Sequence, residues 1–221
     1  MNKKALIVWG GWAGHDPENI AKLFERVLKE HGFSVSVSPA LDAFNDAAGL
    51  KDLSLIVPIW TMGTISNEQC KNVCEAVSAG VGIGGVHGGM CDAFRSNTEW
   101  QFLTGGQFVA HPGNDGINYK VNFTGKHWIT DGLVDYEVSS EQYYMHVDPA
   151  NTVLATTKFP IAAGPHVPNG EVIMPLTWIK QYGKGRVFYC SLGHTAKVVE
   201  QPQTLKMCTR GLLWAARAES A

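Results

Sequence analysis

The chain has 221 residues, of which 45% are hydrophobic and 17% are charged, as is usual for a globular protein with a sizeable core. Its formal net charge of −2 gives no reason to expect a nucleic-acid partner, and no apolar run approaches the length of a membrane span. The five cysteines contain no C-x-x-C pair, and the first apolar run is too short for a signal-peptide core. We therefore expect a cytoplasmic protein in a reducing compartment, with no membrane partner.

The first half of the chain alternates between strand and helix patterns. Short apolar or alternating runs, typical of strands in a covered sheet, occupy residues 5–9, 33–37, 53–60 and 81–86. A helix should begin with Asp16 as its N-cap and Pro17 at its first position, and another should begin with the capping box at Ser66. Ala93 and Phe94 should lie on a further short helix.

The second half is less regular before it ends in a hairpin and a helix. Residues 100–168 are rich in Gly, Pro, Asn and aromatic residues, with short strand-like runs at 119–123 and 152–156. We expect this stretch to leave the sheet and to wall a site, within a single domain that spans residues 1–221. Residues 176–181 and 186–191 predict a hairpin, and residues 202–217 predict a helix. The pattern indicates an α/β fold with an open, mostly parallel sheet, helices on both faces and strand 81–86 near its centre.

Three histidines directly follow predicted strands. His15 comes after the first strand, His87 follows strand 81–86, and His194 follows the last strand. Ligands of open α/β sheets bind outside the carboxyl ends of the strands, where such loops converge. We therefore expect the three side chains to surround one pocket.

The turn at His87 is the most informative of the three. The sequence around it is Gly-Val-His-Gly-Gly, which is typical of a nucleophile elbow between a strand and a helix. A class I glutamine amidotransferase carries cysteine at this point, and Cys91 lies too far along the chain to replace it. We expect no glutaminase activity. His87 is left as an acid or base, a metal ligand, a hydrogen-bonding partner of a sugar, or a turn residue bonded only to backbone.

Several segments resemble the successive motifs of the trehalose-utilisation (ThuA-like) proteins. They are residues 9–11, 86–94, 105–112, 127–133, 183–189 and 193–194, so the resemblance covers nearly the whole chain in order. It implies a fold of the class I glutamine amidotransferase-like (flavodoxin-like) type without glutamine hydrolysis, and a role in the use of trehalose or related sugars. The same resemblance implies a sugar dehydrogenase as partner and a 3-keto glycoside as substrate, on which an isomerase, lyase or hydrolase would act.

Two other functions remain open. One is a non-catalytic sugar-binding subunit of a dehydrogenase, and the other is an amidotransferase relative with a different nucleophile. An oligomer is also compatible with the sequence.

The candidate site residues divide into two groups. His87 and Glu141 are the acid and base candidates. Substrate-binding candidates are Trp12, His15, Trp60, His111, Tyr143, His146 and His194. If residues 141–146 form a strand, Glu141 and His146 point apart, because alternate residues of a strand face opposite sides. His127 more simply caps a turn, and His31 and His166 are expected on the surface and in a loop.

The sequence indicates no cofactor with certainty. A divalent metal such as zinc is an alternative, since imidazole is one of its preferred ligands. Its ligands would come from His15, His87, His111, His146 and His194. No H-x-H or H-E-x-x-H spacing supports such a site locally.

Overall fold

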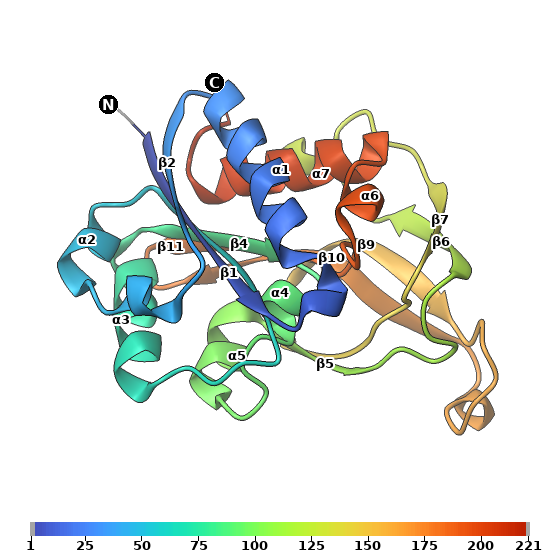
Figure 1. Ribbon diagram of the computed structural model, residues 1–221. Coiled ribbons are helices and arrows are strands. Elements are labelled where there is room, and N and C mark those ends of the chain that lie inside the picture. The colour runs from blue at the N-terminus through green and yellow to red at the C-terminus, as the bar shows by residue number, and fades with distance from the viewer. Residues whose placement is uncertain (1–2, 220–221) are drawn as a thin grey trace.

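The computed structural model describes residues 3–219, which build a nine-stranded sheet covered by helices on both faces (Figure 1). The strand order is β2-β1-β3-β4-β11-β10-β9-β6-β7. Within residues 3–219, no helix combines the length and the apolar character that a membrane crossing requires.

Five neighbouring strands form the larger, parallel part of the sheet. They are β1 (Lys3–Gly11), β2 (Phe33–Ser38), β3 (Leu55–Thr61), β4 (Gly82–Val86) and β11 (Gly185–Cys190). β4 is buried along its whole length and lies between β3 and β11, so its expected central place is confirmed. The helices α1 (Pro17–Glu30) and α3 (Asn67–Ala79) make the long crossovers that parallel neighbours require.

The remaining strands of the sheet are antiparallel. β10 (Val172–Tyr182) pairs with β11 as the predicted hairpin, and the order continues with β9 (Thr152–Phe159), β6 (Ile117–Phe123) and β7 (Tyr136–Ser140). The expectation that residues 100–168 leave the sheet is wrong for β6, β7 and β9, which hydrogen-bond onto its free edge. It holds for β5 (Gly106–Ala110) and β8 (Tyr144–Val147), which form a separate two-stranded sheet.

Each face of the sheet has its own hydrophobic core. Ile7 of β1 joins the core under α1, and its neighbour Val8 joins the core on the other face, as the alternation of a strand requires. The helices on the first face are α1, α6 (Ala196–Val199) and α7 (Pro202–Ala215). Those on the second face are α2 (Ala47–Lys51), α3, α4 (Gly88–Cys91) and α5 (Thr98–Thr104). Short 3-10 helices occupy Ala13–His15 (η1), Leu41–Phe44 (η2), Trp128–Thr130 (η3) and Val167–Asn169 (η4).

Two helix starts and one short helix test the local predictions. The capping box at Ser66 is confirmed. Asp16 stands at the N-cap of α1, but its carboxylate accepts from Asn19 and from the backbone N–H of Ala196 and makes no cap bond.

The short helix expected at Ala93 and Phe94 is not there, because α4 ends at Cys91. The carbonyls of residues 92 and 93 accept instead from the backbone N–H groups of Met62 and Gly63, in the loop after β3.

Candidate functional site

Three histidines meet at the carboxyl ends of adjacent strands. His15 ends η1 directly after β1, His87 follows β4, and His194 comes shortly after β11. β1, β3, β4 and β11 are neighbours and run parallel. The loops that follow them therefore lie together at the C-terminal ends of the strands. The ring centroids of His15 and His87 are 4.5 Å apart, and that of His194 lies 5.3 Å and 5.6 Å from them. The predicted convergence of the three side chains is confirmed.

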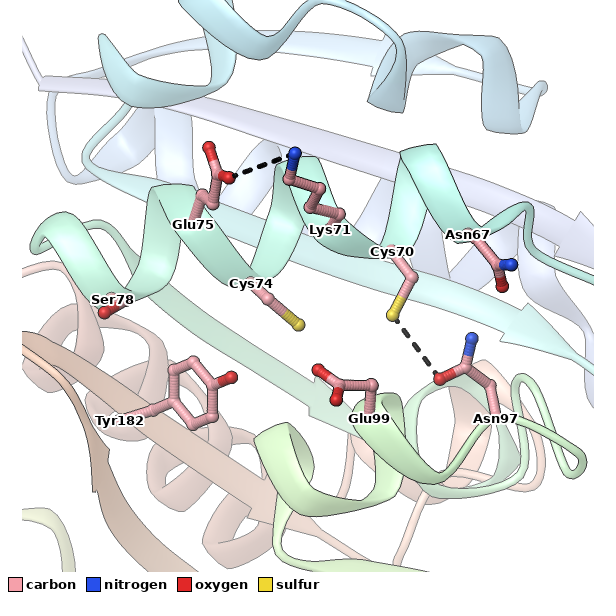
Figure 2. Close-up of a pocket in the computed structure, with 9 residues that line it drawn as sticks. All are labelled: Asn67, Cys70, Lys71, Cys74, Glu75, Ser78, Asn97, Glu99 and Tyr182. Carbon is pink, nitrogen blue, oxygen red and sulfur yellow. Dashed lines mark hydrogen bonds and ion pairs between the residues drawn. The ribbon is translucent and has the colours of Figure 1, made fainter.

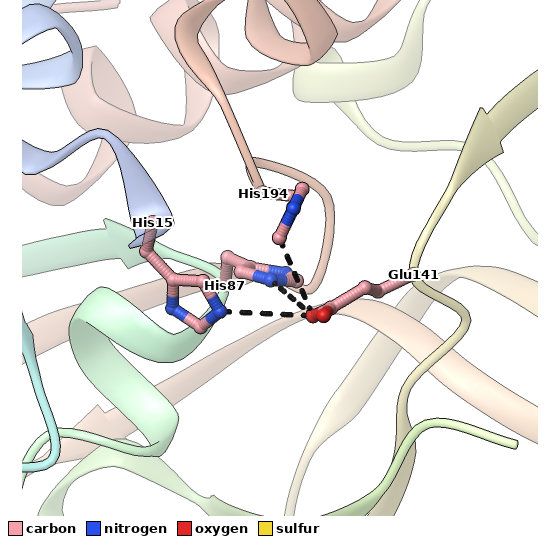
Figure 3. Close-up of side chains that lie close together, drawn as sticks. All are labelled: His15, His87, Glu141 and His194. Atoms are coloured by element: carbon pink, nitrogen blue, oxygen red, sulfur yellow. Dashed lines mark hydrogen bonds and ion pairs between the residues drawn. The ribbon is translucent and has the colours of Figure 1, made fainter. Parts of the chain in front are cut away.

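One carboxylate, that of Glu141, points toward all three imidazole rings (Figure 3). Glu141 lies between β7 and β8. Its Oε2 atom is 3.1 Å from His87 Nε2, 3.5 Å from His194 Nδ1 and 3.6 Å from His15 Nε2. One ligand atom from each of the four residues lies within 4.8 Å of all the others. We call these four residues the histidine–glutamate cluster.

The backbone that carries Glu141 is anchored to the antiparallel strands. The Tyr119 hydroxyl of β6 donates to the Glu141 carbonyl at 2.9 Å. The next side chain, Gln142, donates to Thr157 Oγ1 and to the Lys158 carbonyl of β9, at 2.8 Å each. The carboxylate is therefore held in place by the part of the sheet that extends beyond the parallel strands.

The turn at His87 brings two of the histidines close together. His87 has a φ of +51°, a left-handed conformation that is uncommon for a residue other than glycine. Its backbone N–H donates to the Cys190 carbonyl at 2.7 Å, which fixes the end of β4 beside β11. A Cβ atom on Gly88 would lie 2.6 Å from His15 Nδ1, so only glycine allows the His15 ring to pack against this turn.

The tautomer of His87 follows from its two contacts. Nδ1 lies 2.7 Å from the Ser191 backbone carbonyl, which can only accept, so Nδ1 carries a proton. Burial lowers the pKa of His87 to about 4, although Glu141 and the Ser191 carbonyl favour the charged ring, so the imidazole is neutral at pH 7. Nε2 therefore presents a lone pair to Glu141 Oε2, and two acceptors face each other at 3.1 Å. A cation between the two atoms would remove this repulsion.

Glu141 is a charged group in a buried place. Its exposed fraction is 5%. Burial alone would raise its pKa, but the contacts with His15 and His194 outweigh burial and hold the pKa of Glu141 below its usual range. The same carboxylate raises the pKa of His194. An anionic oxygen among imidazole nitrogens is a donor set that zinc and similar divalent metals favour.

Partners outside the cluster orient two of the rings. His15 Nδ1 is 3.0 Å from Thr61 Oγ1 at the end of β3, which leaves His15 Nε2 directed at Glu141. The Ser191 carbonyl does the same for His87. Hydrogen bonds of this kind fix the ring orientation of metal-ligating histidines. Sequence reasoning did not single out either partner: Thr61 could have been found from its place at a strand end, but a backbone carbonyl leaves no signal in the sequence.

Aromatic rings and one further histidine surround the cluster. Tyr143 stacks on the His87 ring at 3.9 Å between centroids, and the half-exposed Trp12 meets the His15 ring edge-on at 4.7 Å. His111 reaches the cluster from the loop after β5, with Nε2 3.8 Å from Glu141 Oε1 and about a third of its side chain, 34%, exposed.

The other expected residues have different surroundings in the structure. His146 is exposed on β8, on the opposite side of the strand from the buried Met145, and it lines a separate cavity with Asp148. The Trp60 indole packs so closely on two glycines, Gly10 and Gly63, that a Cβ atom there would lie 2.6 Å and 2.2 Å from it. His127 accepts from the Ile129 N–H at 3.2 Å, so its expected role as a turn cap is confirmed.

A second cavity, of about 480 Å³, lies beside α3 and contains none of the cluster residues (Figure 2). Cys70 and Cys74 line it from α3, opposite Glu99 and Tyr182. Both cysteines are almost fully buried, as the expected core packing requires, and Cys70 Sγ donates to Asn97 Oδ1 at 3.5 Å. We assign no chemistry to this cavity.

The family profile described as trehalose utilisation (ThuA) matches residues 4–215. The chain belongs to the trehalose-utilisation family. The resemblance expected from the sequence motifs is thereby confirmed. No curated protein matches the sequence.

Solved ThuA-like structures show the same fold. A ThuA-like protein of Parabacteroides merdae is 18% identical, with a TM-score of 0.73 over 98% of this chain and 90% of its own. A ThuA-like protein of Bacteroides uniformis is 17% identical, with a TM-score of 0.76 over 96% of this chain and 91% of its own. A β-galactosidase of Rahnella sp. R3 contains a similar region, with 17% identity and a TM-score of 0.64, over 99% of this chain and 32% of the galactosidase. At these identities the likeness concerns the fold alone.

Proposed function

We propose that this ThuA-family protein is a metal-dependent enzyme that acts on a keto sugar, and that the histidine–glutamate cluster holds the metal. The observation that carries the proposal is the set of distances from Glu141 Oε2 to the three imidazole nitrogens, which are 3.1, 3.5 and 3.6 Å. In a tetrahedral zinc site with bonds of about 2.1 Å, neighbouring ligand atoms lie about 3.4 Å apart. The side chains thus already stand at the separations of a ligand set.

The contacts support a ligand role for His87 and Glu141 better than the expected role of acid and base. A catalyst that moves a proton needs a free atom within reach of the substrate. His87 is buried, its Nδ1 donates to the Ser191 carbonyl, and Glu141 Oε2 lies against its Nε2 at 3.1 Å. Three rings surround Glu141 Oε2, so that oxygen has little room for a substrate proton.

His111 is better placed to move a proton. It borders the cluster, and 34% of its side chain is exposed, so a substrate can reach part of the ring. A divalent metal held by the four cluster residues would polarise a substrate carbonyl only by taking its oxygen as a fifth ligand. His111 could then withdraw a proton from the carbon next to that carbonyl, which is the chemistry of an isomerase or a lyase.

The family and the strand order support the remaining parts of the proposal. Trehalose utilisation points to a sugar, and a 3-keto glycoside made by a partner dehydrogenase would bring the carbonyl that this centre requires. The order β2-β1-β3-β4-β11 of the parallel strands supports the flavodoxin-like, class I glutamine amidotransferase-like arrangement. We place the enzyme in the cytoplasm, where free thiols are maintained.

The test combines metal content with turnover. Wild-type protein should bind about one zinc per chain and convert a 3-keto glycoside, and His87→Ala should lose both while its circular dichroism spectrum stays unchanged. His146→Ala is the matched control, since it removes an exposed histidine outside the cluster and should change neither property. Equal turnover by metal-free protein would refute the metal role. Sugar binding without turnover would favour the alternative of a sugar-binding subunit.

A further inference from the structure

The third imidazole of the cluster, that of His194, has a carboxylate on its outer side. Its Nδ1 atom faces Glu141 Oε2 at 3.5 Å, and its other ring nitrogen, Nε2, lies 3.9 Å from Asp115 Oδ2. The side chain of Asp115 is 60% exposed, whereas that of His194 is 14% exposed. Asp115 therefore stands at the border between the cluster and solvent, on the side of the ring that is opposite Glu141.

The loop between β5 and β6 brings Asp115 to this place. Gly113 in this loop has a φ of +90°, a conformation that favours glycine. A Cβ atom on Gly113 would lie 2.4 Å from the side chain of Ile117, so the loop packs closely onto the start of β6. His111 at the beginning of the loop and Asp115 near its end both face the histidine–glutamate cluster.

The other two imidazoles of the cluster already have oxygen atoms behind them. His15 Nδ1 lies 3.0 Å from Thr61 Oγ1, and His87 Nδ1 donates to the Ser191 carbonyl at 2.7 Å. A histidine that binds a metal almost always donates its second ring N–H to a carboxylate, a backbone carbonyl or water. That bond fixes the tautomer and the orientation of the ring. The third ring requires an oxygen at the corresponding place.

We propose that Asp115 is the outer partner of His194, a positioning residue whose carboxylate accepts a hydrogen bond from Nε2–H and leaves the Nδ1 lone pair for a metal. This inference rests on the proposed function, because it requires that the cluster holds a metal. A movement of about 1 Å would shorten the separation of 3.9 Å to an ordinary hydrogen bond of about 2.9 Å. The carboxylate is free to make this movement, since within residues 3–219 it has no hydrogen-bond or ion-pair partner other than His194.

Competition with a chelator measures what Asp115 contributes to zinc binding. Asp115→Ala should raise the zinc Kd about tenfold, at the lower end of the range of about 10–100-fold for outer partners, because the pair is partly exposed. Asp131→Ala is the matched control. It removes the same charge from another exposed loop, and the cavity that Asp131 lines contains none of the cluster residues. The control should leave the zinc Kd within about twofold of wild type, since salt screens distant exposed charges.

Nuclear magnetic resonance of zinc-loaded protein with nitrogen-15 histidine separates positioning from a general effect of charge or folding. Wild-type protein should show His194 protonated at Nε2, with the resonance assigned by its loss in His194→Ala. Asp115→Ala should move this N–H resonance and speed the exchange of its proton with water, because the accepting carboxylate is gone. The ring N–H resonance of His87 should stay unchanged, since its partner is the Ser191 carbonyl.

Two results would overturn the positioning role and leave the metal site in place. One is a zinc Kd within about twofold of wild type for Asp115→Ala, and the other is a His194 N–H resonance that does not respond to this change. Wild-type protein that binds no zinc would contradict the proposed function itself, and the role of Asp115 with it.

Discussion

Thr61→Val removes one oxygen atom behind His15 and keeps nearly the same side-chain volume. The lost contact is 3.0 Å long and joins two buried residues, with exposed fractions of 2% for Thr61 and 6% for His15. His15 Nδ1 would be left without a partner, and an unpaired buried group costs about 1–3 kcal/mol. The ring would also lose the bond that keeps Nε2 directed at the cluster. Removal of such an outer partner typically lowers metal affinity by about 10–100-fold.

Two measurements check this prediction. Competition with a chelator should show a zinc Kd raised by about 10–100-fold, and urea unfolding of the metal-free protein should show a loss of about 1–3 kcal/mol. Thr152→Val is the matched control, because Thr152 is exposed at the start of β9 and its replacement should stay within about 0.5 kcal/mol of wild type. A zinc Kd within twofold of wild type for Thr61→Val would refute the view that Thr61 positions a ligand.

Three further predictions concern the core, a buried ion pair and the His87 turn. Gly211→Ala should lower the stability of the protein in urea, because the new Cβ would lie 2.3 Å from the Phe188 ring and such overpacking costs about 1–3 kcal/mol or more. This cost should exceed the gain of about 1 kcal/mol that alanine brings to a helix. Equal stability of the variant and wild type would contradict this packing. Lys180 donates to Asp148 at 2.6 Å and lowers the pKa of that carboxyl. The ion pair therefore stabilises the folded protein fully at pH values above the pKa of an unfolded aspartate, about 4, and its contribution is lost as the pH falls below that value. Lys180→Met should therefore flatten the decline of the melting temperature between about pH 5 and pH 3, and an unchanged slope would exclude this ion pair as its source. The protein should release no ammonia from glutamine, since the elbow holds His87 in place of a thiol; release that is lost in His87→Ala would contradict the sugar assignment.

The histidine part of the site could be predicted from the sequence because strand ends are local signals. A buried apolar run followed by glycines and a histidine indicates where a strand ends and which side chain follows it. In neighbouring parallel strands these ends lie side by side, so the side chains that follow them come together. His15, His87 and His194 follow this logic. Only the resemblance to the family made Glu141 a candidate, because it lies 54 residues from His87 in the sequence and no motif spacing links the two.

The rest of the site depends on pairings that are distant in sequence. β6, β7 and β9 join the sheet through antiparallel partners from separate segments, and their short, polar-flanked patterns look like those of isolated hairpins. The side on which each residue of segment 141–146 lies depends on where β8 begins, so Tyr143 reaches the cluster and His146 does not. Trp60 shows the same limit, because its packing on Gly10 becomes visible only when β1 and β3 are placed side by side.

Anomalous diffraction at the zinc edge, from crystals of protein prepared with one equivalent of zinc, tests the central claim most directly. We predict a single strong peak within about 2.0–2.2 Å of His15 Nε2, His87 Nε2, His194 Nδ1 and one oxygen of Glu141. A peak at any other group of residues, or none in protein shown to be folded, would contradict the assignment of the histidine–glutamate cluster as a metal centre.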